Sequence, residues 1–152
     1  MEEEHLSDIA SALGVPRERI IDHQWVDNGP HWAAVELADA AEVLDLAPNL
    51  DAFPGMEVGV FGGYPEGSPH KFEIRAFIHG LGEDPVTGSL NASVAQWLHR
   101  DGRAGSGYVA SQGTRLQRAG EVHISIEGDR VWVGGVTSTR FSGGADLQFT
   151  IV

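Results

Sequence analysis

The spacing of apolar residues predicts two short helices in the first third of the chain. Within segment 6–13 the apolar residues fall at positions i, i+3, i+4 and i+7, on one face of a helix, and Gly14 follows as a stop signal. Further along, Asp39 precedes Glu42 by three residues, which is a capping arrangement, and the short helix it opens runs through Leu46. We expect both to be peripheral helices.

Most of the remaining apolar residues lie in short alternating stretches, which predict strands. In segment 72–78 the even-numbered residues form one apolar face, while Glu73, Arg75 and Phe77 lie on the other. The clearest local prediction is a hairpin near the end of the chain, which turns at Gly128-Asp129. The predicted strands are 20–26 (closed by the turn pair Asn28-Gly29), 32–37, 57–61, 72–78, 106–116, the hairpin strands 122–127 and 131–133, and 147–152.

One helical segment interrupts this β pattern in the middle of the chain. Segment 89–100 places Leu90, Val94, Trp97 and Leu98 on one side, and most of its other residues are small. Small residues on the remaining faces suit a helix that is surrounded on most sides. The predicted fold class is therefore α+β: a curved, mostly antiparallel, barrel-like sheet wrapped around one central helix, with short peripheral helices.

Composition and charge exclude several classes of function. The 152 residues suit one domain with a single core. Ten basic residues oppose twenty-two carboxylates and give a net charge of −12, which argues against binding to nucleic acids or to anionic membranes. The acidic N-terminus lacks the features of a signal peptide, and no apolar run approaches the ~20 residues that span a bilayer. We expect a cytoplasmic protein.

Metal and cofactor signals are weak throughout the sequence. There is no cysteine, which rules out disulfides, thiolate metal sites and thiol nucleophiles, and the seven histidines show no metal-binding spacing. Segment 59–63 is rich in glycine but lacks a dinucleotide fingerprint, so we interpret it as a turn. No metal and no cofactor are predicted.

The segment that leads into the central helix carries the most chemistry. Asp84-Pro85 favours a turn, the hydroxyl of Thr87 can cap the first helical turn, and Gly88 allows a ligand to approach the backbone closely. The amides at a helix N-terminus are unpaired and carry partial positive charge, so this arrangement suits a carboxylate or phosphate. On these residues alone, an equally good interpretation is that Asp84 and Thr87 only cap a structural helix.

A resemblance to a known family bears on this choice. Arg75-Ala76-Phe77, followed by Glu-Asp-Pro-Val-Thr-Gly-Ser-Leu-Asn-Ala at 83–92, strongly resembles the signature of the PhzF (phenazine-biosynthesis) family, which has the diaminopimelate-epimerase fold. One position departs from the family pattern, because Gln117 stands where the family commonly has glycine. The resemblance covers nearly the whole chain, with further matches at 24–30, 111–113, 118–120 and 131–135.

The resemblance implies a fold, an activity and a set of site residues. Family members have two similar domains with the active site between them, and they isomerise a dihydro-hydroxyanthranilate by moving a proton without a cofactor. By this resemblance Asp84 and Ser89 match catalytic positions. The substrate carboxylate is expected at Thr87, Gly88, Ser89 and Leu90.

The resemblance also implies that residues 1–152 form a single domain equivalent to the C-terminal half of a family member. The family's proton-shuttling glutamate lies in the first domain, near a Gly-Asn-Pro motif that this sequence lacks. We therefore expect either a homodimer in which Asp84 of both copies faces one cleft, or pairing with a separately encoded first half. A binding module that holds a small anion without chemistry, and a module with only an assembly role, remain as alternatives.

Overall fold

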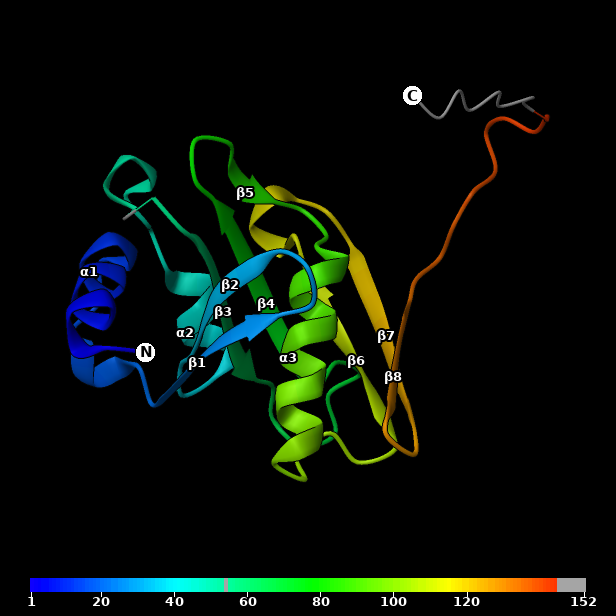
Figure 1. The fold of residues 1–152 in the computed structure, drawn as a ribbon, viewed down its shortest axis with the longest axis horizontal. Helices are drawn as coiled ribbons and strands as arrows, with labels where there is room; N and C mark the ends of the chain where they lie inside the picture. Colours follow the sequence, from blue (N-terminus) through cyan, green and yellow to red (C-terminus); the bar gives the residue numbers. More distant parts are fainter. Residues whose placement is uncertain (54, 145–152) are drawn as a thin grey trace, which may run out of the picture.

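A computed structural model describes residues 1–53 and 55–144, and its main feature is a curled eight-stranded sheet with helices on both faces (Figure 1). Seven strands follow one another in the order β1-β2-β3-β4-β6-β7-β8, and β5 pairs with β4. The strands are β1 (Asp22–Asp27), β2 (His31–Glu36), β3 (Glu57–Gly63), β4 (Phe72–Ile78), β5 (Gly82–Asp84), β6 (Gly107–Gln112), β7 (Gly120–Glu127) and β8 (Arg130–Gly134). The helices are α1 (Glu3–Leu13), α2 (Ala40–Asp45) and α3 (Gly88–Arg100), with short 3₁₀ turns η1 (Arg17–Arg19), η2 (Leu50–Ala52) and η3 (Thr114–Leu116).

The sheet is mixed, although most of its neighbouring strands are antiparallel, as predicted. β2 pairs in parallel with β3, and β4 pairs in parallel with β6. Parallel neighbours need a crossover connection. The first crossover contains α2 and the second contains β5 and α3, so each parallel pair brings one helix onto a face of the sheet.

Helix α3 lies inside the curl, in front of the sheet in Figure 1, and contacts β1, β7 and β8. The residues predicted for its apolar side are all buried in one core cluster: Leu90, Val94, Trp97 and Leu98. A Cβ added at Gly59 in β3 would lie 2.3 Å from the Leu90 side chain. Segment 59–63 is therefore not a turn, and that interpretation was wrong. It belongs to β3, where glycine lets the central helix approach the strand closely.

Helices α1 and α2 cover the opposite face of the sheet and form a second core with β2, β3 and β4. The predicted caps are confirmed: Gly14 ends α1 in the left-handed region at φ 75°, and the Asp39 carboxylate accepts the amide N–H of Glu42 at 2.9 Å. A Cβ at Gly62 would lie 2.3 Å from the carbonyl oxygen of Asp39, so this glycine admits the start of α2.

Strand β4 is buried on both faces because it lies between the two helical layers. Its even-numbered side chains pack toward α3, as the alternation predicts. On the other face Phe77 belongs to the second core, and both Glu73 and Arg75 are buried. The period-two pattern gives the orientation of this strand correctly but does not show that α2 covers its polar side.

Three predicted segments differ from or fall outside the structure. Strand 106–116 ends at Gln112, because Gly113 and Gln117 both adopt left-handed backbone conformations and enclose η3. The first strand begins at Asp22 instead of residue 20, whereas the predicted hairpin is confirmed, with Glu127 opposite Arg130. The predicted strand 147–152 lies outside the described residues.

Candidate active site

The candidate site lies where the short strand β5 leads into α3. Asp84 pairs with Ala76 of β4, so the register of the sheet fixes where the loop begins. Thr87, three residues further on, is the N-cap of α3, which begins at Gly88. Asp84 and Ser89 are half-buried, Thr87 is buried and Gly88 is exposed. The structure therefore brings the predicted site residues together at one end of the central helix.

The hydroxyl of Thr87 does not cap α3, although the sequence suggested that it could. Its hydroxyl makes no cap bond to the helix and instead donates to Oδ2 of Asp84 at 2.5 Å. Threonine has a single hydroxyl proton, and here the proton is engaged by the carboxylate. The backbone N–H of Thr87 donates instead to Oε1 of Gln112 at 3.0 Å.

Gln112 is a site residue that sequence reasoning did not assign. It is fully buried at the end of β6, and its Nε2 donates to the Asp84 carbonyl oxygen at 3.0 Å and to Thr87 Oγ1 at 2.9 Å. Its Oε1 also accepts from Asn91 Nδ2 at 2.8 Å. In the sequence, Gln112 could be noticed only as a polar residue within segment 111–113, which resembles the family. The pairing of β4 with β6 is needed to show that its side chain reaches the loop.

Ser89 stands on the first turn of α3 and is held by a buried tryptophan. The indole N–H of Trp32 donates to Ser89 Oγ at 3.2 Å. Because an indole nitrogen only donates, the serine oxygen acts as the acceptor and its own proton remains for another partner.

The backbone at the start of α3 supplies further donors. The first intrahelical bond runs from the N–H of Asn91 to the carbonyl of Thr87 at 3.1 Å, so the amides of Gly88, Ser89 and Leu90 come before the first amide that donates within the helix. A Cβ added at Gly88 would meet no atom within 4 Å, so space is open above this backbone. The side chain of Leu90 is fully buried in the core, and its contribution to a site would be its amide.

A family model described as PhzC-PhzF, phenazine biosynthesis-like protein, matches residues 1–145. The chain belongs to this family. Among curated relatives, Antisense-enhancing sequence 1 of Schizosaccharomyces pombe is 29% identical over 158 residues, covering 91% of this chain and 52% of that protein. An uncharacterized isomerase of the same yeast is 30% identical over 141 residues, covering 80% of this chain and 75% of that protein.

A solved structure shows the same fold. The crystal structure of a Bacillus anthracis phenazine biosynthesis protein of the PhzF family superposes with a TM-score of 0.67 at 15% identity, covering 84% of this chain and 50% of that one. The predicted family and fold are therefore confirmed. The chain spans about half the length of this structure and of the first yeast relative.

Two arginines in family-like motifs have different surroundings. Arg75 is buried, pairs with both oxygens of Glu83 at 3.0 and 2.7 Å, and donates to the carbonyl oxygens of Val43 and Leu46 at the end of α2. These bonds engage its guanidinium in holding α2 and β5 on the sheet. Arg118 is exposed on the segment after η3, and its backbone N–H donates to the Gly113 carbonyl at 3.0 Å.

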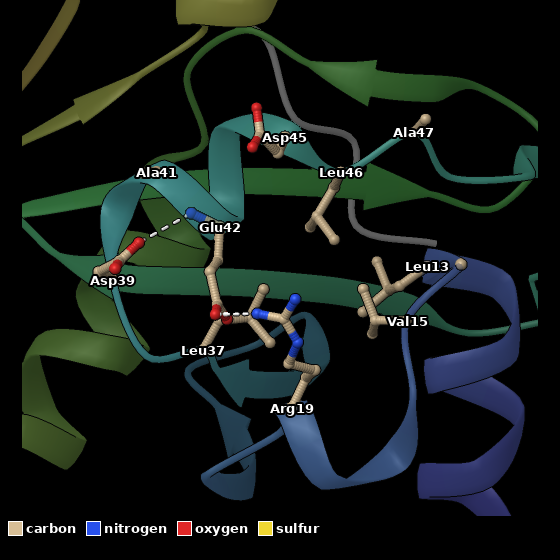
Figure 2. A pocket seen from close by; sticks show the side chains of 11 residues that line it. Leu13, Val15, Arg19, Leu37, Asp39, Ala41, Glu42, Asp45, Leu46 and Ala47 are labelled. Atoms are coloured by element: carbon tan, nitrogen blue, oxygen red, sulfur yellow. Dashed lines mark hydrogen bonds and ion pairs between the residues drawn. The ribbon is translucent and has the colours of Figure 1, made fainter.

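A separate pocket of about 410 Å³ opens on the outer face, between α2, the end of α1 and the segment that follows it (Figure 2). Leu13 and Leu46 line it, and three of its charged side chains are already engaged: Asp39 caps α2, and Glu42 pairs with Arg19. The sheet separates this pocket from α3, so it does not belong to the predicted site.

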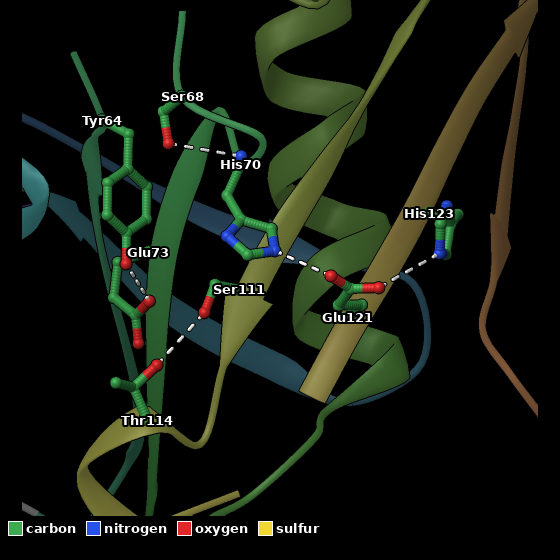
Figure 3. Close-up of polar contacts among 8 residues, drawn as sticks. All are labelled: Tyr64, Ser68, His70, Glu73, Ser111, Thr114, Glu121 and His123. Atoms are coloured by element: carbon green, nitrogen blue, oxygen red, sulfur yellow. Dashed lines mark hydrogen bonds and ion pairs between the residues drawn. The ribbon is translucent and has the colours of Figure 1, made fainter. Parts of the chain in front are cut away.

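A second polar cluster lies along β4, β6 and β7 (Figure 3). The fully buried Glu73 accepts from the Tyr64 hydroxyl at 2.8 Å, and burial, followed by this bond, raises the pKa of Tyr64 to about 12. Nearby, His70 lies 3.0 Å from Glu121.

Residues 1–53 and 55–144 contain no group of three or more His, Cys, Asp or Glu that could hold a metal ion. Among these residues no helix has the length and apolar character needed to cross a membrane.

Proposed function

We propose that this PhzF-family chain binds a small cyclic or aromatic-type carboxylate at the start of α3 and moves a proton on it through Asp84, without a cofactor. The observation that carries the proposal is the convergence of the Asp84 carboxylate, the Ser89 hydroxyl and the amides of Gly88 and Ser89 at one helix end. In this reading the chain corresponds to the C-terminal half of a two-domain family member.

The start of α3 supports binding of the substrate carboxylate. Amides at a helix N-terminus carry partial positive charge and point along the axis toward an anion. The Ser89 hydroxyl, whose oxygen is held by Trp32, adds a side-chain donor beside them. The open space at Gly88 lets the ligand reach this backbone.

Asp84 supports the proton transfer. A positioned carboxylate next to the bound ring can accept a proton from one carbon, and an acid returns a proton to another. Thr87 and the sheet register hold Asp84 in place, which is what such a transfer requires.

The second wall of the cleft is proposed to come from another copy of the chain. Exposed apolar side chains lie on segments next to the loop: Leu81 in the turn before β5, Val86 in the loop itself and Leu116 in η3, at 83%, 47% and 39% exposure. Two copies related by a two-fold axis could cover these side chains and bring both Asp84 residues into one cleft. Like charges at close range favour one shared proton, so the pair would supply one base and one acid. A separately encoded first half is the alternative partner.

The decisive experiment is deuterium exchange into a dihydro-hydroxyanthranilate in D₂O, followed by NMR, for the wild type and Asp84→Asn. Exchange by the wild type and its loss in the variant are expected. The free amides at the start of α3 also suit a second candidate, a non-catalytic module for small anions. Saturable binding of anthranilate without any exchange would establish that candidate instead, and absence of both would leave only an assembly role.

A further inference from the structure

The orientation of the Gln112 side-chain amide is fixed by two backbone groups. The Thr87 N–H can only donate, so the Gln112 atom 3.0 Å from it must be the oxygen. The Asp84 carbonyl can only accept, so the Gln112 atom 3.0 Å from it must be the nitrogen. These assignments agree, and Asn91 Nδ2, which also donates to the Thr87 carbonyl at 2.9 Å, confirms that Gln112 Oε1 is an acceptor.

This orientation determines the direction of the Thr87 hydroxyl. Gln112 Nε2 donates to Thr87 Oγ1 at 2.9 Å, which occupies a lone pair of the hydroxyl oxygen. The hydroxyl proton is then left for Asp84 Oδ2 at 2.5 Å. Hydrogen bonds therefore run in one direction, from Gln112 through Thr87 to Asp84.

The position of Gln112 itself is fixed by close packing at the end of β6. A Cβ added at Gly113 would lie 2.7 Å from the Pro85 carbonyl oxygen, and one added at Gly120 would lie 2.5 Å from the Gln112 carbonyl oxygen. The ends of β6 and β7 thus pack directly against the loop that carries Asp84. This packing fixes the backbone of Gln112 relative to the loop, and the hydrogen bonds to Thr87 and Asp84 hold its side chain there.

We propose that Gln112 is a positioning residue for the proton transfer: acting through Thr87, it keeps Asp84 Oδ2 as a hydrogen-bond acceptor and leaves Oδ1 as the atom that takes and returns the proton. The inference rests on the proposed function. In the transfer the substrate C–H bond breaks, its electron pair stays on the ring and an O–H bond forms at Oδ1. A ring carbon then takes a proton from that O–H or from the partner's acid, so the isomerisation is balanced without any oxidant.

Two substitutions break the hydrogen-bond chain at different points. Gln112→Glu keeps the size of the side chain and its acceptor bonds to Thr87 N and Asn91 Nδ2, but the carboxylate cannot donate to Asp84 or to Thr87 Oγ1. Thr87→Val keeps the shape and removes the hydroxyl, and Thr87→Ser restores it. Ser93→Ala is the matched control, because Ser93 is buried on the same helix and its Oγ has no partner among the described residues.

The rates of deuterium exchange and the affinities for anthranilate are measured for all four variants. We expect Gln112→Glu and Thr87→Val to lower the exchange rate about a hundredfold, within the range that a positioned proton-transfer group contributes. The Kd for anthranilate stays within about threefold, since the α3 amides remain. Thr87→Ser recovers most of the lost rate and Ser93→Ala keeps the wild-type rate. Wild-type exchange in both Gln112→Glu and Thr87→Val, or equal losses of exchange and binding, would overturn the proposal.

An NMR measurement on the apo protein tests the hydrogen-bond chain without catalysis. A buried, bonded hydroxyl proton on Thr87 should exchange slowly enough to be observed in the wild type and should disappear in Gln112→Glu. If this signal is present but the wild type shows no deuterium exchange into the substrate, the proposed function fails while the hydrogen-bond chain stands. If the signal is absent from an active wild type, the role of Gln112 is refuted and the proposed function stands.

Discussion

The indole nitrogen of Trp32 lies 3.2 Å from the hydroxyl oxygen of Ser89 and joins the sheet to the first turn of the central helix. Trp32 is 2% exposed and belongs to the core around α3. The bond sets the rotamer of a serine that would otherwise be free to turn toward solvent. A core residue of β2 thereby orients a candidate substrate-binding group.

Trp32→Phe should weaken both stability and binding. The variant keeps an aromatic ring in the core but loses the bond to Ser89 and part of the packing, at a cost of about 1–3 kcal/mol in the free energy of unfolding. The released serine should weaken anthranilate binding several-fold, measured by titration calorimetry. Trp97→Phe is the control: Trp97 is equally buried and lies on α3 away from its start, so it should lose stability without losing affinity.

Gly88→Ala should separate ligand binding from folding. The added methyl group meets no protein atom within 4 Å, and alanine favours a helix by up to about 1 kcal/mol, so the melting temperature should stay the same or rise. The methyl group does occupy the space where a carboxylate would contact the backbone, and affinity for anthranilate should fall at least about tenfold, more than 1.4 kcal/mol. Gly63→Ala is the control: a methyl group there also meets no protein atom within 4 Å, and Gly63 pairs with Phe72 at the start of β4, away from the loop. This variant should keep full affinity. Unchanged binding by Gly88→Ala would argue against this helix end as the anion site.

Gln117→Gly should stabilise the protein. Gln117 is the single described non-glycine residue with positive φ, at 57°, and a side chain in this region costs about 1–2 kcal/mol. Glycine removes that cost but loses more conformational entropy on folding, so we expect a net gain of up to about 1 kcal/mol in urea unfolding. Leu116→Gly, one residue earlier within η3, provides the control and should destabilise. A loss of stability in Gln117→Gly would mean that the glutamine side chain makes a compensating contact.

His23 should make the folded state sensitive to mild acid. Burial, the nearby N-terminal ammonium group and Arg17 lower its pKa in the folded state. The unfolded chain therefore binds a proton on this residue more readily, and His23 should reduce stability as pH falls through about 6.5, the unfolded pKa of histidine. His23→Gln should remove that part of the decline between pH 7 and 5, measured by urea unfolding. Acetylation of Met1 removes one of the causes and should reduce the decline partly; identical profiles for all three proteins would contradict the assignment.

Val86→Glu should separate the proposed dimer. The side chain of Val86 is 47% exposed beside Asp84, and a charge there would face its own copy across the two-fold axis. Light scattering should show a dimer for the wild type at tens of micromolar and a monomer for the variant. Ile21→Glu is the control, since Ile21 is 59% exposed and precedes β1 at the opposite end of the sheet from α3's first turn. A wild type that stays monomeric would rule out the homodimer.

Local sequence patterns predict the helices and the terminal hairpin because their causes are local. Gly14, Asp39 and the turn at Gly128 each act within a few residues of the element they bound. The two parallel strand pairs and the helical layer over β4 depend on contacts between distant segments, so no local pattern reports them. Gly59 illustrates the difference. The glycine-rich composition of segment 59–63 suggested a turn, but glycine is needed at position 59 because the side chain of Leu90, 31 positions later in the chain, packs against it.

The candidate site follows the same division. Asp84, Thr87, Gly88 and Ser89 are neighbours in sequence, so a motif can identify them together. Gln112 lies on another strand, and the orientation of its side-chain amide is fixed by the Thr87 N–H and the Asp84 carbonyl of the loop. Its contribution becomes visible only when β4 and β6 are placed side by side.

The parallel pairing of β4 with β6 has a kinetic consequence. The chain between them includes β5 and α3, so the pairing of these strands requires the closure of a long connection. The hydrogen bonds between Gln112 and Thr87 form across that same junction. We therefore expect the loop around Asp84 to become ordered late and to open only with the sheet, so that the Thr87 amide exchanges with solvent through global unfolding.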